Sequence, residues 1–148
     1  MAKFIYGMQS ILNIKGKMEE QAKMEFAAAR RRLDDEEEKL EALSGRKFAY
    51  EEEGRRLRKD SLHVQDILDN RNAIQAMEEL IKNQQLQVKR AENMLELARV
   101  KLQEAMQERK THEKLRENAF AVFMQEENAR ESKEIDELVS YTYGQKTR

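Results

Sequence analysis

The stretch IQAMEELIKNQQLQVKRAENMLELARVKLQEA, Ile74 to Ala105, decides the fold because its apolar residues recur with a seven-residue repeat. One series of positions carries bulky apolar side chains, and the series three residues further on carries mostly small ones. The two series are Ile74, Ile81, Val88, Leu95 and Leu102, and Met77, Gln84, Ala91, Ala98 and Ala105. They correspond to the a and d positions of a coiled coil. The stretch therefore predicts a long helix that packs along one narrow edge against another helix.

The repeat continues beyond this stretch but loses its apolar character at Arg109 and His112. Apolar residues return in NAFAVFMQEE, Asn118 to Glu127. Phe120 and Phe123 lie three residues apart, so they point to one side of a helix, with Met124 beside them. We expect this cluster either to be held out for another protein or to be covered by a bend of the helix or by self-association.

The composition agrees with long helices rather than with a compact globule. The 148 residues include no proline, no cysteine and five glycines, and 39% of them are charged. The common residues are strong helix formers. This high charged fraction leaves too little apolar surface for a thick core. We therefore expect stability to come from one seam between helices and from a partner.

The first half of the chain repeats its apolar residues less strictly. These residues are Phe4, Met8, Ile11, Met18, Ala22, Phe26, Ala29, Leu33, Leu40, Leu43, Phe48 and Tyr50. Between the halves, Gly54 loosens the chain, and Asp60 or Ser61 can cap a new helix. We predict a single domain over 1–148, with helix one at about 4–57, a turn at about 57–62, helix two at about 62–140 and a short flexible C-terminal tail.

The predicted fold class is all-α, with the two long helices forming an antiparallel coiled-coil hairpin. If the chain turns at residue 60, Leu43 faces Met77, Ala22 faces Ala98, and large side chains meet large ones. Phe4 then faces Arg116, and helix two projects beyond helix one. The cluster around Phe120 would lie on this projection without a partner in the chain.

Several function classes find little support in the sequence. The net charge is −1 and no basic patch alternates with aromatic residues, which argues against nucleic-acid binding. His63 and His112 are isolated, so we predict no metal site, and the many carboxylates lie on helix surfaces without a pocket for acid–base chemistry. We therefore expect no enzyme, no catalytic residue and no cofactor. A membrane-surface helix around Lys3, Lys15 and Lys17 is the weaker alternative to a seam that continues to the N-terminus.

Both ends of the chain resemble the flagellar export protein family FliJ. The resemblance is carried by KFIYGMQSILNIKGKMEEQAKMEFAAA at 3–29 and by ERKTHEKLRENAFAVFMQEENARESKEIDELV at 108–139. The matching residues of the closing motif are Glu113, Lys114, Leu115, Arg116, Glu117, Phe120, Phe123, Glu126, Glu127, Lys133, Glu134, Ile135, Asp136 and Glu137. The middle of the chain, 34–72, is similar to the family only in its pattern.

The resemblance implies a stalk and adaptor of flagellar type III protein export that is not an enzyme. Such proteins are hairpins similar to the central stalk of rotary ATPases, and they bind inside the export ATPase hexamer and promote its assembly and activity. They also contact the large cytoplasmic subunit of the export gate and help to recycle export chaperones. We accordingly expect a cytoplasmic monomer at the flagellar basal body, peripheral to the membrane through its partners. The stalk of a virulence type III secretion system and a self-associating coiled-coil structural protein remain as alternatives.

The resemblance also suggests which residues meet each partner. The end that holds both chain termini would enter the ATPase ring, through Phe4, Met8, Ile11, Phe120, Phe123 and Met124. The turn end would face the export gate, through Leu40, Leu43, Tyr50, Met77, Leu80 and Gln84. Leu43 and Met77 are also seam residues in the predicted register, so the second set follows from position alone.

Overall fold

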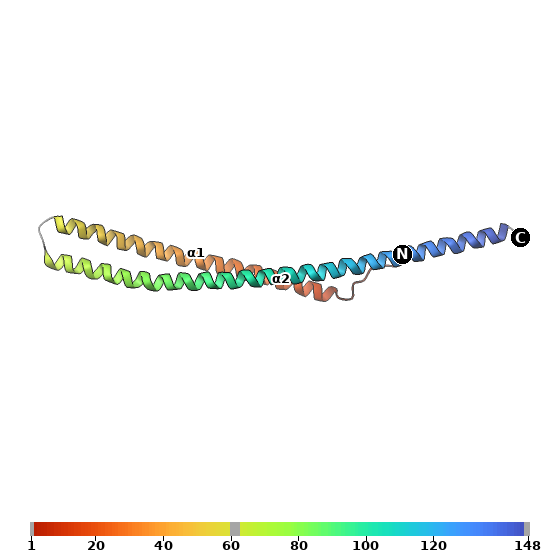
Figure 1. Ribbon diagram of the computed structural model, residues 1–148, viewed down its shortest axis with the longest axis horizontal. Helices are drawn as coiled ribbons and strands as arrows, with labels where there is room; N and C mark the ends of the chain where they lie inside the picture. The colour runs from red at the N-terminus through yellow and green to blue at the C-terminus, as the bar shows by residue number, and fades with distance from the viewer. Residues whose placement is uncertain (1, 60–62, 147–148) are drawn as a thin grey trace. The chain divides into compact units, whose positions relative to one another are not determined.

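The computed structural model describes residues 2–59 and 63–146, and those residues form two long α-helices and no strand (Figure 1). Helix α1 spans Gln9–Lys59, and helix α2 spans Val64–Lys146. Two long helices were predicted, and this prediction is confirmed. Two of the expected turn and cap positions, Asp60 and Ser61, lie outside the described residues.

The helix ends differ from the expected bounds for local reasons. Helix α1 begins at Gln9 rather than near residue 4, and Gly7, which costs about 1 kcal/mol in a helix interior, precedes this start. The amides of Ile11 and Leu12 both bond to the Met8 carbonyl oxygen at 3.1 Å, which closes the first turn. At the other end, α2 continues past residue 140 to Lys146, because no proline ends it earlier.

Internal contacts divide the chain into two compact units. One unit is Gln21–Gln103, and the other joins Met1–Glu20 with Glu104–Arg148. In both units, later residues of α1 meet earlier residues of α2. Each unit is therefore an antiparallel pair of segments, as the predicted hairpin requires.

The unit Gln21–Gln103 has a narrow core built from small and branched side chains. Its buried apolar residues are Ala22, Leu33, Met77, Ala91 and Ala98. The bulky members of the predicted repeat are half-buried beside them, namely Ile74, Ile81, Val88 and Leu95. The series read from Ile74 to Leu95 is therefore the packed edge of α2, which confirms the predicted coiled-coil seam.

Two polar contacts cross this seam at the expected register. Gln84 Nε2 donates to the Glu36 backbone oxygen at 2.9 Å, and Asn70 Nδ2 donates to the Tyr50 backbone oxygen at 2.8 Å. Both pairs are the ones that a turn at residue 60 predicts. Because these polar groups are partnered, they cost little when the seam covers them.

Helix α1 follows a stricter seven-residue repeat than its apolar residues suggested. Most of its buried or half-buried positions form two series, namely Leu12, Glu19, Phe26, Leu33, Leu40, Lys47 and Gly54, and, three residues on, Lys15, Ala22, Ala29, Glu36, Leu43, Tyr50 and Leu57. Met8, Ile11, Met18 and Phe48 are exposed instead. The repeat of the first half looked less strict because only apolar residues were counted, whereas several seam positions are charged.

Within 2–59 and 63–146, neither helix carries a stretch long and apolar enough to cross a bilayer.

Candidate functional site

An aromatic cluster of Phe4, Phe120 and Phe123 lies in the unit that holds both termini. The Phe4 ring meets Phe120 edge-on with centroids 5.2 Å apart, and it meets Phe123 at 5.4 Å in a tilted arrangement. The Phe120 and Phe123 rings are stacked at 6.4 Å. The prediction that Phe120 and Phe123 lack a partner in this chain was therefore wrong. Residues 2–6 are not helical, and an extended chain rises roughly 3.3 Å per residue against 1.5 Å in a helix, so Phe4 reaches further along α2 than a helical residue would.

Arg116 joins the aromatic cluster to the start of α1. Its guanidinium carbon lies 5.7 Å from the centroid of the Phe4 ring, within the range of a cation–π contact. Its Nε donates to Gln9 Oε1 at 2.9 Å. The predicted pairing of Phe4 with Arg116 is present, and α1 begins beside Arg116, at Gln9.

The aromatic cluster is only partly covered. Phe4 and Phe123 are half-buried, whereas Phe120 is 46% exposed. The neighbouring Val122 and Met124 are also exposed. Exposed apolar surface of this kind usually marks an interface with another molecule. The cluster is therefore both an internal contact and an accessible surface.

A second apolar surface follows on the last part of α2. All residues from 128 to 145 are exposed, and an apolar stripe with helical spacing runs along them. The stripe consists of Ile135, Leu138, Val139, Thr142 and Tyr143, of which the last four line a shallow hollow. Sequence reasoning did not identify this stripe, although its three- and four-residue spacing is visible in the chain.

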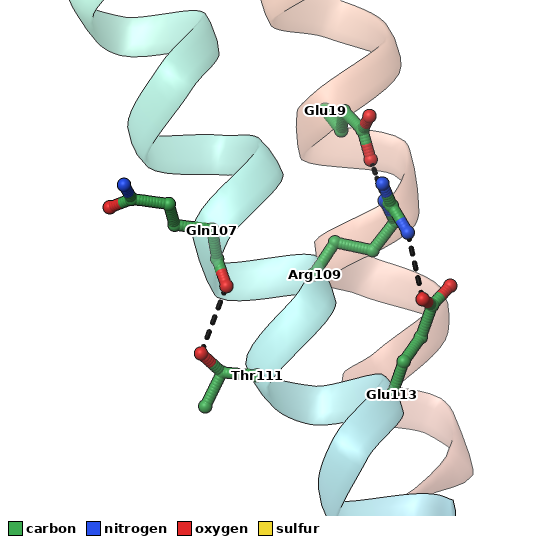
Figure 2. Close-up of polar contacts among 5 residues, drawn as sticks. All are labelled: Glu19, Gln107, Arg109, Thr111 and Glu113. Atoms are coloured by element: carbon green, nitrogen blue, oxygen red, sulfur yellow. Dashed lines mark hydrogen bonds and ion pairs between the residues drawn. The ribbon is translucent and has the colours of Figure 1, made fainter.

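A charged cluster takes the place of apolar packing in the same unit, where the repeat of α2 fails (Figure 2). Arg109 Nε donates to the buried carboxylate of Glu19, and Arg109 Nη1 donates to Glu113 Oε2 at 2.8 Å. These hydrogen bonds, first to Glu19 and then to Glu113, raise the pKa of the Arg109 guanidinium. A buried carboxylate is tolerated only when it is paired, so Glu19 explains why arginine occupies a seam position.

A second ion pair lies close to this charged cluster in the sequence. Lys15 Nζ donates to Glu108 Oε2 at 2.8 Å. The hydrogen bond from Lys15 lowers the pKa of the Glu108 carboxyl, and the positive charge of Lys15 adds to the effect. Polar interactions therefore hold this part of the two helices together.

Three of the residues expected to enter the ATPase ring contact one another. Phe4, Phe120 and Phe123 come together, and Met124 is exposed beside them. Met8 and Ile11 are exposed as well.

The residues expected to face the export gate are mostly engaged in the seam. Met77 is 6% exposed, and the Gln84 amide is bonded to Glu36. Leu40, Leu43 and Tyr50 are half-buried. Of these six residues, Leu80 alone has a largely free side chain, at 45% exposure.

The described residues include no group of three or more His, Cys, Asp or Glu placed to hold a metal ion. What the geometry offers is an accessible apolar surface, formed by the aromatic cluster and by the stripe, on an otherwise charged helix pair. Such a surface suits binding to another protein.

Comparison with known proteins identifies relatives at the level of family and fold. Residues 5–148 match the protein family described as Flagellar FliJ protein. No curated protein matches the sequence. The fold is similar to the solved structure of a putative YscO homolog, CT670, from Chlamydia trachomatis, with a TM-score of 0.72 and 23% identity over 95% of this chain and 96% of that chain.

Proposed function

This chain belongs to the flagellar FliJ protein family, and we propose that it is a stalk and adaptor of flagellar type III protein export. It binds inside the hexameric export ATPase and promotes the assembly and activity of that ring. It also links the ring to the large cytoplasmic subunit of the export gate and to export chaperones. It catalyses no reaction itself and works in the cytoplasm at the base of the flagellum.

The observation that carries this proposal is the partly exposed aromatic cluster next to a fully exposed length of α2. Phe120 lies at the edge of the covered part of α2, and the exposed residues 128–145 follow it. A helix that enters a protein ring needs side chains available around its circumference. Aromatic side chains commonly dominate the binding free energy of such interfaces.

The test is the double substitution Phe120→Ala with Phe123→Ala, measured by urea unfolding and by binding to the purified export ATPase hexamer. Both rings are partly exposed, so unfolding should lose far less than the about 3–5 kcal/mol of each core Phe→Ala change. Binding should weaken by at least about 2 kcal/mol.

The matched control is Phe48→Ala, which removes a phenylalanine ring that is 61% exposed in the other compact unit. It should leave ring binding unchanged. A large loss of stability with ring binding intact would show that the aromatic cluster is ordinary core, and the proposal would fail.

Contact with the export gate can be tested at Leu80, the exposed member of the expected gate residues. Leu80→Ala should weaken binding to the gate's large cytoplasmic subunit without loss of helix content. Met77→Ala should instead lower stability, because Met77 is buried. If Leu80→Ala has no effect on gate binding, the gate-facing surface lies elsewhere.

The similarity of fold to the putative YscO homolog favours one alternative, a stalk of a virulence secretion system. Binding to the flagellar ATPase in preference to a virulence ATPase from the same cell would separate the two. A self-associating structural protein is the other alternative. Sedimentation equilibrium should give the monomer mass of 17.5 kDa, and a dimer or filament would favour that alternative.

A further inference from the structure

Residues 2–8 precede α1 and hold the Phe4 ring against α2. Residues 2–6 are not helical, and the Gln9 amide bonds to the Tyr6 carbonyl oxygen at 3.1 Å where the segment joins the helix. Phe4 is half-buried, but its neighbour Ile5 is 81% exposed. Tyr6 is half-buried as well, and its ring stacks on Phe4 with centroids 6.5 Å apart, but Phe4 is the ring of this segment that contacts Phe120 and Phe123 of α2.

The contacts of Phe4 describe a receptor site for one aromatic ring. Phe120 meets the ring edge-on, Phe123 lies tilted beside it, and the Arg116 guanidinium lies over it. Edge-on rings and cation–π contacts are favourable but individually weak. The segment adds no helix of its own before Gln9, so its release breaks few interactions.

We propose that residues 2–8 form a strap that covers Phe120 and Phe123 in the free protein and is exchanged for an aromatic side chain of the partner on binding. This proposal rests on the proposed function, because the partner is the export ATPase ring. Phe4 shows which ligand the site binds, namely an aromatic ring on a non-helical segment, packed beneath the Arg116 guanidinium. The incoming side chain has the same chemistry and takes over the same three contacts.

The strap lowers the apparent affinity for the ring, because binding draws on the fraction of molecules in which the strap has opened. Removal of the Phe4 ring should therefore tighten ring binding rather than weaken it. A direct role of Phe4 in contacting the ring predicts the opposite change, so the sign of the effect separates the two.

The chain has no tryptophan, so a single tryptophan at position 4 reports on the strap without interference. The emission of Phe4→Trp in the isolated protein should shift to longer wavelength when Phe120 and Phe123 are replaced by alanine. Saturation with the purified ATPase hexamer should shift the emission of Phe4→Trp in the same direction. The wild-type chain mixed with the hexamer is the blank for tryptophans of the ATPase.

The affinity measurement uses Phe4→Ala, with Ile5→Ala as the matched control in the same segment. Phe4→Ala should bind the hexamer several-fold more tightly than the wild type, and Ile5→Ala should bind like the wild type. Circular dichroism of each variant checks that the helices remain.

Each failure has a distinct signature. If the emission of Phe4→Trp does not change when Phe120 and Phe123 are replaced by alanine, the strap does not exist. This conclusion holds whether or not the protein binds the ATPase hexamer. Unchanged or weaker binding of Phe4→Ala, with the wild type binding normally, would overturn the exchange and leave the proposed function standing. Absence of ring binding by every variant would overturn the proposed function, and the exchange with it.

Discussion

Asn70 lies so close to Gly54 that a Cβ atom added to Gly54 would come within 2.5 Å of Asn70 Oδ1. Both residues are buried, and the Asn70 amide reaches past Gly54 to the Tyr50 carbonyl oxygen. Glycine at this position therefore allows the two helices to approach closely. Helix α1 continues through Gly54 without a break. The expectation that Gly54 loosens the chain before a turn was wrong.

Gly54→Ala should lower the free energy of unfolding, although alanine is the better helix former. The new methyl group would push the Asn70 side chain away and leave a buried amide without its partner, at a cost of about 1–3 kcal/mol. Gly45→Ala is the matched control, because no atom lies within 4 Å of an added Cβ there. It should gain about 1 kcal/mol from helix propensity. Urea unfolding followed by circular dichroism compares the two, and equal gains would contradict the close contact.

Cysteines introduced at Ala22 and Ala98 should form a disulfide within one chain. Both positions are buried in the seam of one compact unit, and the natural chain has no cysteine to compete. Cysteines at Met24 and Ala98 are the control pair, because Met24 is 68% exposed. Non-reducing electrophoresis after mild oxidation reads the result. Dimers cross-linked between chains in the first pair would argue for a parallel assembly instead of the hairpin.

The pair of Glu19 and Arg109 should behave differently when one or both partners are removed. Glu19→Ala leaves the guanidinium of a seam arginine without its carboxylate and should lower the urea midpoint. Replacement of both residues by leucine continues the apolar seam and should restore the midpoint to the wild-type value or above it. A double variant as unstable as Glu19→Ala would mean that the pair holds the fold in a way that apolar packing cannot replace.

The ion pair of Lys15 with Glu108 makes stability depend on pH at the acidic side. The folded pKa of Glu108 is lowered from its ordinary value of 4.5, because Lys15 donates a hydrogen bond to the carboxylate. This contribution is therefore present above about pH 4.5 and is lost as the pH falls through the lowered pKa. Lys15→Met should make the fall in urea midpoint between neutral pH and pH 3 shallower. Lys114→Met, which removes an exposed lysine paired within its own helix, should not.

The fold was predictable because the apolar repeat of α2 is nearly complete from Ile74 to Leu102. That regularity indicated a pair of long helices, and the predicted turn at residue 60 supplied their antiparallel direction and the pairing of Glu36 with Gln84. The register of α1 was not predictable from its apolar residues, because Glu19, Lys47 and Gly54 occupy seam positions without an apolar side chain. These residues fit the seam only because residues of α2 lie opposite them, such as Arg109 opposite Glu19 and Asn70 opposite Gly54. The pattern of α1 by itself contains no information about these partners.

The candidate site was predictable in composition but not in geometry. Phe120 and Phe123 stood out because few aromatic residues occur in the chain. Their contact with Phe4 depends on the loss of helix before Gln9, and helix ends are the least certain feature of a sequence pattern. The expected gate residues include Met77, which the seven-residue repeat already assigns to the seam, and Met77 is 6% exposed.

The 83 residues of α2 form one helix, but its backbone is protected in two different ways. Up to Phe123, side chains of the earlier part of the chain cover one edge of it, so an amide there exchanges its hydrogen only when that packing opens. From 128 to 145 every residue is exposed, and the helix depends on its own hydrogen bonds, which open turn by turn from the end. In deuterated buffer, the peptides of α2 should therefore label slowly as far as Phe123 and quickly beyond residue 128. Enclosure of those last turns by a surrounding protein would slow their labelling to the pace of the rest.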